Sequence, residues 1–569
     1  MDDAGGRPEV ALDVEIGLAE AEIAAGQAGE AIARLQALIE APVYDPRLHY
    51  AMAAALGAAG DLEGARAALA DAQTFHALQL IRDAGADLDR LTSDPAYAVQ
   101  LGHMFYARKL MGPAAAAFSQ AVTRPEPTAQ AVVSWGLSLQ HQGRIEEALT
   151  AFRFAAAQFP QSAVHEFLLY ACFFAEDGVQ LHAAEVRRWA ERYAPPYDPR
   201  ARIFPNPSPA GRRLRVGYVA PSFMGSQLRQ FILPVLEHHD PDRVEVVLYA
   251  ADSGAEAGAP ASLVRSIAAL DDHQVASRVV EDRIDVLVDL WGHTAGGRLG
   301  VFALKPAPVQ AAWINYVQST GLEAMDYVLH ADGTAAPGDQ ELFTETIWRL
   351  GPVAAPFRPG RRLDPTPTPA LSEGVVTFAS FNHPSRLNDA TIAAWARILK
   401  GRPNSRLLLK YAYFDDPVLQ SATLSRFAAH GVGSARILFE GHSTGEAYLA
   451  AFGRIDLALD PSPCPGGTTS SEAVANGVPL LTLRGPDFYS RVGTLRLEPL
   501  GLHQLVAEDW DDYVDRALAL TADLEALQAL RASVRPRFEA SAIRDEAGFT
   551  RRLEDAFAQM YQHWFDARG

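Results

Sequence analysis

The sequence predicts an array of helical repeats followed by two α/β lobes, each built on a mostly parallel sheet. Two observations lead to this fold class. The first 200 residues are rich in Ala, Leu, Glu and Gln, which favour helices, and they repeat with a period of 34. From Arg213 onward, short apolar runs alternate with helical segments, as in βαβ units. A chain of 569 residues is also too long for one hydrophobic core, so several domains are expected.

Small and aromatic residues carry the period of 34. They recur as Gly102/Gly136, Ala114/Ala148, Phe118/Phe152, Ala121/Ala155, Ala31/Ala65 and Leu35/Leu69. The pattern blurs between residues 75 and 95, which predicts a degenerate unit there. The period resembles the tetratricopeptide repeat, in which helical hairpins stack into a curved solenoid. Its concave surface would grip an extended peptide or partner; a spacer or a dimerisation platform is the alternative.

Changes in composition predict four parts. Residues 1–200 hold the repeats, 201–360 the first lobe, 361–372 a Pro-rich linker, and 373–569 the second lobe with terminal helices. Two Rossmann-like lobes joined in this way enclose a cleft. Ligands of open α/β sheets lie beyond the carboxyl ends of the strands, so the loops at those ends are the first place to look for a site.

Short apolar runs predict the strands of both lobes. In the first lobe we expect strands at 214–219, 244–249, 284–290, 309–316 and 325–329, with helices at 228–237 and 262–270. In the second lobe we expect strands at 375–381, 406–410, 436–439, 455–459 and 480–483, followed by a helical tail over 510–565.

The segment Gly466-Gly467-Thr468-Thr469 lies where a predicted strand turns into a helix. Glycines let a ligand approach the backbone, and the free N–H groups at a helix start favour an anion. The hydroxyls of Thr468 and Thr469 can donate to phosphate oxygens. An ordinary N-capped turn is the alternative, because Ser and Thr are common caps. The position at a strand end in a two-lobed chain favours the phosphate site.

Two other loops follow strands of the second lobe. Asn382, His383 and Arg386 come after its first strand, and Arg386 is a permanent cation that can bridge two phosphate oxygens. Ser443 and Tyr448 come after its third strand, where Tyr448 could stack on a base. Each loop alone could be a polar turn. Three loops that converge from one sheet favour a binding site.

In the first lobe, one strand ends with candidate proton-transfer groups. Asp289 closes the predicted strand and His293 follows it in a glycine-containing loop. A structural His that caps a turn is an equal alternative. The next strand leads into a polar loop with Asn315 and Thr320, which could face the same cleft.

Composition excludes several functions. The net charge of −19 argues against a nucleic-acid partner, which needs clustered cations. Cys172 and Cys464 are the only cysteines and lie far apart, so they provide neither a disulfide framework nor metal-ligand spacing. The acidic start of the chain lacks the features of a signal peptide, and no apolar run approaches the ~18 residues of a membrane span. A soluble, cytoplasmic protein with no membrane partner is expected.

Short motifs run through both lobes in a fixed order. They are Leu214–Phe231, Gly292–Gly296, Pro306–Gln310, Ser319–Gly321, Met325–Tyr327, Asp460-Pro461, Gly466–Thr469, Glu472-Ala473, Gly477–Pro479 and Ser490–Gly493. Together with the repeats they resemble glycosyltransferase family 41, which contains the O-GlcNAc transferases and the plant SPINDLY-type O-fucosyltransferases. The resemblance implies a GT-B fold, inversion at the anomeric carbon, no metal or other cofactor, and transfer to Ser or Thr of proteins held by the repeats.

The resemblance also implies a donor site in the second lobe. It puts the donor diphosphate on Thr468 and Thr469, and a residue beside the base on Tyr448. Arg386 stands where the family usually has Lys, so the cation is kept while its geometry changes. The predicted donor-binding set is Asn382, His383, Arg386, Ser443, Tyr448, Gly466, Gly467, Thr468, Thr469 and Glu472.

The sugar side departs from the family pattern. Many bacterial relatives read Ser-Pro-Asp-Phe-Arg-x-His-Ser after the first strand, whereas this chain has Ser222 in place of the acid and Ser226 in place of the His. The usual Gly-Tyr-Pro is Asn315-Tyr316-Val317. These changes indicate a different sugar or an unusual base. The residues assigned to the sugar and acceptor side are Ser222, Ser226, Gln227, Asn315 and Thr320.

Two hypotheses follow. The first is a protein O-glycosyltransferase in which Arg386 stabilises the departing phosphate and Asp289 or His293 is the base. Its donor is UDP-GlcNAc-like or, as in the flagellin-modifying members that this architecture resembles, a CMP-activated nonulosonic acid with flagellin as acceptor; a CMP donor has one phosphate and would need fewer cations. The second is a non-catalytic adaptor with a degenerate transferase half. The sugar, the acceptor and the oligomeric state, a homo-oligomer included, stay open.

Overall fold

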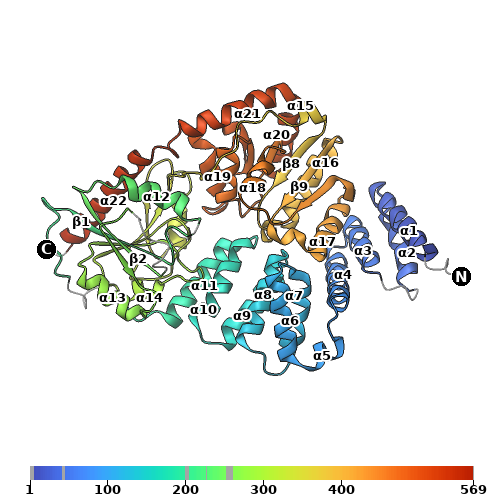
Figure 1. Ribbon diagram of the computed structural model, residues 1–569, viewed down its shortest axis with the longest axis horizontal. Helices are drawn as coiled ribbons and strands as arrows, with labels where there is room; N and C mark the ends of the chain where they lie inside the picture. Colours follow the sequence, from blue (N-terminus) through green and yellow to red (C-terminus); the bar gives the residue numbers. More distant parts are fainter. Residues whose placement is uncertain (1–5, 41–44, 199–203, 226, 252–259, 568–569) are drawn as a thin grey trace.

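The computed structural model describes residues 6–40, 45–198, 204–225, 227–251 and 260–567. It has three parts. A helical array (blue to cyan in Figure 1) leads into a first α/β lobe (green), and a second α/β lobe (orange to red) lies against both. This arrangement confirms the predicted fold class, a repeat solenoid followed by a two-lobed α/β fold.

The array consists of helices that pack against their neighbours in the chain, as expected for stacked hairpins. They are α1 (Gly6–Ala24), α2 (Ala28–Ile39), α3 (Pro46–Ala58), α4 (Leu62–Asp83), α5 (Leu88–Ser93), α6 (Pro95–Ala107), α7 (Met111–Val122), α8 (Ala129–His141), α9 (Ile145–Gln158), α10 (Ser162–Ala171), the 3-10 turn η1 (Cys172–Phe174) and α11 (Gly178–Tyr193). Where the sequence pattern blurs, α4 has 22 residues and α5 only 6, so the unit there is irregular.

The repeated glycines mark the closest approach of two helices in a hairpin. A Cβ on Gly102 would lie 2.6 Å from the ring of Phe118, and one on Gly136 would lie 2.5 Å from the ring of Phe152. Both phenylalanines are fully buried. The period in the sequence therefore reflects one packing contact made in two successive units.

Gly136→Ala is expected to destabilise the protein by about 1–3 kcal/mol, because the added methyl group overpacks the core against Phe152. Gly29→Ala is the matched control. Gly29 lies in α2, and a Cβ there meets no heavy atom of the described residues within 4 Å, so this change should be neutral or slightly stabilising. Thermal unfolding measures both variants. A Gly136→Ala melting temperature equal to that of wild type would contradict the contact.

The first lobe holds a parallel sheet whose described strands lie in the order β3-β2-β1-β4-β5-β6-β7. They are β1 (Leu214–Ala220), β2 (Val244–Ala250), β3 (Leu263–Ser266), β4 (Val286–Asp289), β5 (Val309–Ala312), β6 (Tyr327–His330) and β7 (Thr346–Arg349). Its helices are α12 (Arg229–His238), α13 (Asp272–Glu281), α14 (Leu299–Ala303) and the 3-10 helix η2 (Pro337–Leu342).

The helix predicted over residues 262–270 is wrong. The segment forms the edge strand β3, which pairs with β2, and its residues alternate between half-buried and exposed. That alternation has the period of a strand, but four residues are too few to distinguish it from a helical turn by pattern. The opposite edge strand, β7, is equally short and was not predicted from the sequence.

The second lobe holds a parallel sheet whose described strands lie in the order β10-β9-β8-β11-β12-β13. They are β8 (Val376–Ser380), β9 (Ser405–Lys410), β10 (Ile437–Glu440), β11 (Leu457–Leu459), β12 (Leu480–Leu483) and β13 (Val506–Ala507). The α-helices are α15 (Ala370–Glu373), α16 (Asp389–Gly401), α17 (Pro417–Ala428), α18 (Gly445–Phe452), α19 (Thr468–Ala475), α20 (Trp510–Ala522), α21 (Leu524–Glu539) and α22 (Glu546–Asp566). The 3-10 helices are η3 (Pro384–Arg386), η4 (Ala412–Asp415), η5 (Ser434–Arg436), η6 (Ser490–Arg496), η7 (Glu498–Leu500) and η8 (His503–Leu505).

Both sheets reverse their strand order between two central strands. In the first lobe this happens between β1 and β4, and in the second between β8 and β11. Ligands of open α/β sheets bind outside the carboxyl ends of the strands at such a switch point. The relevant ends are Asp289 in β4, Ser380 in β8 and Leu459 in β11. The segments that follow them should therefore hold the site.

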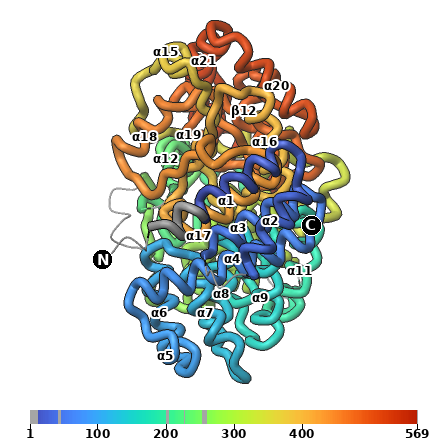
Figure 2. The backbone as a smooth tube through the Cα atoms, turned by 90° about the vertical axis from the view of Figure 1, so that its right-hand side faces the viewer, coloured from blue at the N-terminus to red at the C-terminus, as the bar shows by residue number. Residues whose placement is uncertain are grey.

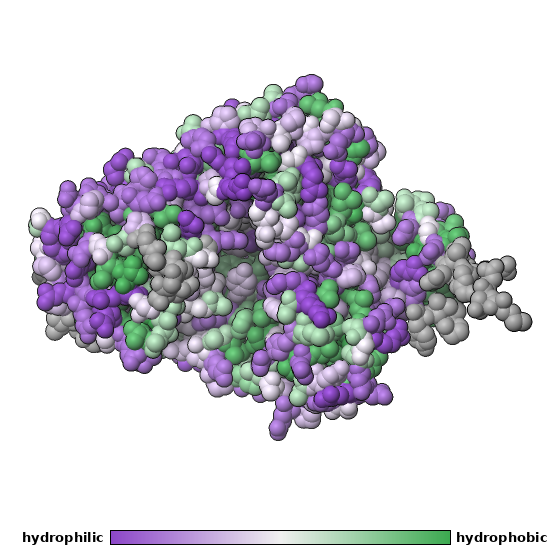
Figure 3. All heavy atoms as spheres, viewed as in Figure 1, coloured by the Kyte–Doolittle hydropathy of each residue, from purple (hydrophilic) through white to green (hydrophobic). Residues whose placement is uncertain are grey.

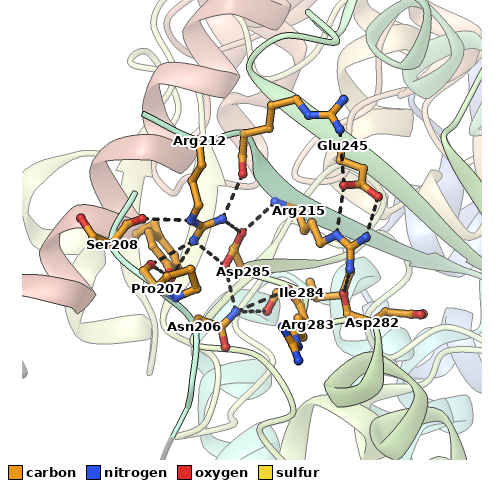
Figure 4. A network of polar contacts seen from close by, with 12 residues as sticks. Asn206, Pro207, Ser208, Arg212, Arg215, Glu245, Asp282, Arg283, Ile284 and Asp285 are labelled. Atoms are coloured by element: carbon orange, nitrogen blue, oxygen red, sulfur yellow. Dashed lines mark hydrogen bonds and ion pairs between the residues drawn. The ribbon is translucent and has the colours of Figure 1, made fainter. Parts of the chain in front are cut away.

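A buried carboxylate fixes the start of the first lobe. Asp285, just before β4, is 1% exposed. It accepts hydrogen bonds from the side chains of Arg212 and Asn206, which lie in the connection from the array, and from the backbone N–H of Arg215 in β1 (Figure 4). The Arg215 guanidinium pairs in turn with Glu245 of β2 at 2.8 Å. This network holds the two switch-point strands in place.

The last helix, α22, packs against α12 of the first lobe (Figure 1). Glu554 in α22 accepts hydrogen bonds from His239 at 3.0 Å and from Arg243 at 3.1 Å. The second sheet lies within residues 373–569, whereas the final helix of that range lies on the first lobe.

The Pro-rich segment 361–372 is attached to the second lobe. The backbone N–H of Leu363 donates to Asn476 at 2.7 Å, and that of Thr368 donates to Gln528 at 2.6 Å. The segment thus connects the lobes while being held along its length by hydrogen bonds.

The array docks on the second lobe through α17, which contacts α3, α4 and α7 (Figure 2). Asp416, at the start of α17, is fully buried and accepts a hydrogen bond from the backbone N–H of Gly112 in α7 at 2.6 Å. Ser425 donates to the carbonyl of Tyr50 in α3 at 2.6 Å. Burial raises the pKa of Asp416 to about 6, although its backbone hydrogen bonds act in the opposite direction. The first half of the array is thus fixed to the second lobe.

The outer surface shows no single dominant patch on the face seen in Figure 3. Hydrophilic side chains cover much of the two lobes, and apolar side chains gather in patches over the repeats. No helix in the described part of the chain is long and apolar enough to cross a membrane.

Candidate functional site

The switch point of the second lobe brings two of the predicted loops together. Asn382 follows β8, and the segment from Asp460 to Thr469 follows β11. The Thr469 hydroxyl donates to the Asn382 side-chain oxygen at 3.1 Å, so the two loops are in direct contact. The sequence predicted both residues as donor-binding, and the structure places them side by side.

Asp460 holds the glycine loop in its shape. Its carboxylate is buried and accepts from the backbone N–H of Gly466 at 3.1 Å and from the hydroxyl of Ser470 at 2.6 Å. A Cβ on Gly466 would lie 2.0 Å from that hydroxyl oxygen, so no other residue fits this position without a shift. Burial raises the pKa of Asp460. The loop is therefore built around an internal acid.

The helix α19 begins at Thr468, immediately after this loop. Its N-cap residue is Gly467, and no described side chain caps the first turn. Uncapped N–H groups at a helix start carry partial positive charge and favour an anion. Thr468 and Thr469 are half-buried, so their hydroxyls lie beside the same helix start.

Two arginines flank the loop. Arg386, in η3, donates to the carbonyl oxygens of Cys464, at 3.2 Å, and Pro465. Arg496, at the end of η6, lies 3.4 Å from the hydroxyl of Ser471 in α19. Sequence reasoning predicted Arg386 but missed Arg496, because a lone arginine three positions after the Ser490–Gly493 motif carries no signal of its own.

Two of the predicted donor-binding residues, Tyr448 and Glu472, bond to each other. The Tyr448 hydroxyl donates to Glu472 at 2.7 Å, and Gln230 of α12 in the first lobe also lies within hydrogen-bond reach of Glu472. Burial raises the pKa of Glu472, although these hydrogen bonds act to lower it. The hydroxyl of Ser443 is buried without a partner among the described residues. Glu472 thus connects the second lobe to α12 of the first lobe.

His383 lies at the junction with the array. Its Nδ1 accepts from the backbone N–H of Ser385 at 3.0 Å. Its ring packs beside His141 of α8 and Phe174 of η1, at centroid distances of 5.0 and 6.3 Å. Burial, the neighbouring His141 and the positive Arg386 all lower the pKa of His383, so it is neutral at pH 7. This residue therefore connects the loop after β8 to the repeats.

In the first lobe, Asp289 is 1% exposed and accepts hydrogen bonds from the backbone N–H groups of Trp291 at 3.3 Å and Gly292 at 2.7 Å. Burial raises the pKa of Asp289 to about 6, while these hydrogen bonds and His293 act to lower it. A carboxyl group that titrates near neutral pH suits proton transfer. It also holds the turn that leads to His293.

His293 is buried between the first lobe and the array. Its Nε2 donates to the carbonyl of Thr320 at 2.8 Å, and its ring meets Trp189 of α11 edge-on at 4.3 Å. Its Nδ1 lies 3.9 Å from a carboxylate oxygen of Glu166 in α10. The side chain is thus enclosed, and its role as a base stays a prediction.

The sugar-side residues are spread over different environments. Thr320 is fully buried, and both its hydroxyl and its backbone N–H donate to the buried Glu345. Thr320 therefore shapes its loop and does not face open space in this structure. Asn315 is exposed and donates to the hydroxyl of Thr294 at 3.3 Å.

The segment after β1 also belongs to the predicted sugar side. The Ser222 hydroxyl accepts from the backbone N–H of Gly225 at 3.0 Å, and Gln227 is exposed. Ser226 lies outside the described residues. The roles predicted for these three residues stay predictions.

An aromatic cluster joins the array to both lobes next to the glycine loop. Phe173 of η1 packs against Tyr316 of the first lobe and Tyr489 of the second, at centroid distances of 5.4 and 4.8 Å. The Tyr489 hydroxyl lies 3.0 Å from the sulfur of Cys464, beside the donor loop. The end of the array therefore contacts both lobes in a buried cluster beside the glycine loop.

Similar proteins are known. The model of glycosyl transferase family 41 matches residues 196–348 and 367–553, which contain nearly all of both sheets. A probable UDP-N-acetylglucosamine–peptide N-acetylglucosaminyltransferase SPINDLY from Hordeum vulgare is 35% identical over 391 residues, 67% of this chain and 41% of that protein. The Oryza sativa subsp. japonica protein of the same name is 36% identical over 392 residues, 67% of this chain and 42% of that protein.

A solved structure is similar over the whole chain. A mutant of the Thermobaculum terrenum O-GlcNAc transferase matches with a TM-score of 0.76 and 27% identity, covering 99% of each chain. By contrast, the chain spans only about two-fifths of the length of the curated plant relatives. The family model covers both α/β lobes, and the switch-point loops lie within its matched residues. The chain therefore belongs to glycosyl transferase family 41.

Proposed function

We propose that this protein transfers a sugar from a nucleotide-sugar donor to Ser or Thr of a protein acceptor held by the repeats. The observation that carries this proposal is the loop at Gly466–Thr469, which pairs an uncapped helix start with the cation Arg386 at the switch point of the second sheet. Membership of family 41 supports the same reaction class. The transfer is proposed to invert the anomeric carbon and to need no metal.

In this mechanism the acceptor hydroxyl attacks the anomeric carbon while the nucleotide leaves as a phosphate anion. The N–H groups at the start of α19 and the guanidinium of Arg386 stabilise the charge that develops on the leaving oxygen. Asp289, with a pKa of about 6, or His293 is proposed to take the proton. Both are 1% exposed, so direct proton transfer requires the loop that connects them to move.

We propose two candidate classes of donor and one candidate acceptor. The names of the plant relatives support a UDP-GlcNAc-like donor, whereas the altered sugar side of this chain supports a CMP-activated nonulosonic acid. Flagellin is the acceptor proposed for the second donor. The aromatic cluster around Phe173 supports an acceptor that reaches the donor from the end of the array.

A thermal-shift panel tests the donor site. UDP, GDP and CMP, each alone and as sugar conjugates, are added to the full chain. A nucleotide that binds only the folded state should raise its stability by about 2.7 kcal/mol at 100 times its dissociation constant. One nucleotide family should raise the melting temperature more than the others. If none raises it, the proposed donor site is wrong.

The alternative function is a non-catalytic adaptor, favoured by Ser226 at the position where many relatives have a His. Release of nucleotide from the best-binding sugar donor distinguishes the two. An adaptor can bind the donor, but it should release no nucleotide above the rate without protein.

A further inference from the structure

We infer that Arg496 is a second donor-binding cation, which recognises an anionic group on the donor beyond the phosphate held by Arg386. This inference rests on the proposed function and deepens it. The second group is either the second phosphate of a nucleoside diphosphate sugar or the carboxylate next to the anomeric carbon of a CMP-linked keto-sugar acid.

The two arginines reach opposite ends of one loop. Arg386 donates to the carbonyls of Cys464 and Pro465, where the loop begins. Arg496 lies against Ser471 in the first turn of α19, and its Nη2 is 4.0 Å from the position that a Cβ on Gly467 would occupy. Because Gly467 has no side chain, nothing on that residue separates the guanidinium from a ligand on the helix start.

The positive charge of this pair is not neutralised by a close carboxylate. In the described residues, both guanidiniums hydrogen-bond only to carbonyl and hydroxyl oxygens. The acid that acts on both guanidiniums is Asp460, whose Oδ1 accepts from Gly466 and Ser470. Among the described residues it forms neither a hydrogen bond nor an ion pair with either arginine. Two cations held together with one internal acid leave an excess of positive charge, which is costly in a partly buried site unless an anion binds.

The charge balance around Arg496 agrees with this geometry. Burial lowers the pKa of Arg496 to about 10; Asp460 acts to raise it, while the neighbouring Arg386 lowers it further. At pH 7 the guanidinium is still charged. An anion bound between the two arginines would offset both the desolvation cost of the Arg496 guanidinium and its repulsion by Arg386.

The geometry also narrows the donor chemistry. A donor with a single phosphate needs only one of these two cations, whereas cations at both ends of the loop suit a donor with two negative groups. A diphosphate has two adjacent phosphates. A CMP-linked keto-sugar acid has a phosphate and a carboxylate on the same anomeric carbon, at similar spacing. Both sources therefore share the chemistry that Arg496 recognises.

Binding measurements with matched nucleotides test the inference. Isothermal titration compares UDP with UMP, and CMP-N-acetylneuraminate with CMP, on wild type, Arg496→Met and Arg496→Lys. In one of the two pairs, wild type should bind the ligand with two anionic groups more tightly than its partner with a single phosphate group. The expected difference in affinity is ~10-fold or more, the effect of one charge-assisted hydrogen bond. Arg496→Met should reduce this preference to less than ~3-fold, and Arg496→Lys should keep part of it, because it keeps the charge.

Arg436→Met is the matched control. Arg436 is also half-buried and bonds only to carbonyl and hydroxyl oxygens of Arg402 and Ser405 among the described residues, but it precedes β10 at the opposite end of the sheet. Its replacement should leave the preference unchanged. Melting temperatures of all variants show whether they fold.

The pair of ligands that shows the preference identifies the second anionic group. A folded Arg496→Met protein that keeps the wild-type preference would overturn this inference but not the proposed function. Equal weakening of both ligands in a pair by Arg496→Met would also overturn it, since the effect would then not depend on the second anionic group. Failure of every nucleotide to bind wild type would contradict the proposed function, and this inference with it.

Discussion

Arg386→Met is expected to lower the rate of nucleotide release from the sugar donor by about 100- to 1,000-fold, the range found when a group that stabilises developing negative charge is removed. The expected loss follows from the position of the Arg386 guanidinium beside the proposed phosphate site. Arg386 follows the switch-point strand β8 and touches the loop that leads into α19. The rate is measured with the donor that gives the largest thermal shift, at saturating concentration.

Arg386→Lys is the control for this prediction. It keeps the positive charge but loses the planar, bidentate geometry, so a loss of only about 10-fold is expected. Because Arg386 also bonds to Cys464 and Pro465, melting temperatures must show that both variants are folded. A folded Arg386→Met protein within ~3-fold of the wild-type rate would remove Arg386 from the proposed mechanism.

The double change Thr468→Ala with Thr469→Ala is expected to reduce kcat/KM by on the order of 100-fold, about one factor of ten for each lost hydrogen bond to a charged group. Thr468 opens α19, and Thr469 connects it to Asn382 at 3.1 Å. Nucleotide affinity should fall in parallel, because both hydroxyls are proposed to donate to the bound phosphate, that of Thr469 after leaving Asn382.

Thr150→Ala serves as the control for a lost threonine hydroxyl. Thr150 is exposed on α9, and its hydroxyl donates to the carbonyl of Glu146 within the same helix. This variant should keep wild-type affinity and rate. A folded double variant with wild-type kcat/KM would show that the phosphate does not bind at the start of α19.

The arrangement of the fold could be predicted from the sequence to the level of its three parts. Each of the pairs Gly102/Phe118 and Gly136/Phe152 makes the same close contact between two helices. Because this contact recurs in each unit, the period of 34 residues is visible in the sequence alone. The central strands are continuous apolar runs because both of their faces are buried. The edge strand β3 was missed, since only four residues in it alternate and neither face is fully covered.

The candidate site could be predicted only where its residues are close in sequence or match a motif. The contact between Asn382 and Thr469 joins residues far apart in the chain, and it was expected because parallel strands end at the same edge. Arg496 could not be found in this way: it lies at the end of the 3-10 helix η6, well after the strand β12 that precedes it, and matches no motif. The enclosure of His293 by Trp189 and Glu166 depends on how the array docks, which composition and spacing do not encode.

The docking of the array has a mechanical consequence. Lobes that share a small interface are normally free to swing relative to each other. Here the helices are attached to the second lobe at α17, and α11 continues into the first lobe, so the array braces the cleft from one side. The helices between these attachments also touch the second lobe, since Ser385 donates to the carbonyl of Gln140 in α8, so the lobes cannot change their relative angle without moving the array. If the repeats hold the acceptor, as proposed, a donor that changes the angle between the lobes would therefore strain the surface on which the acceptor lies.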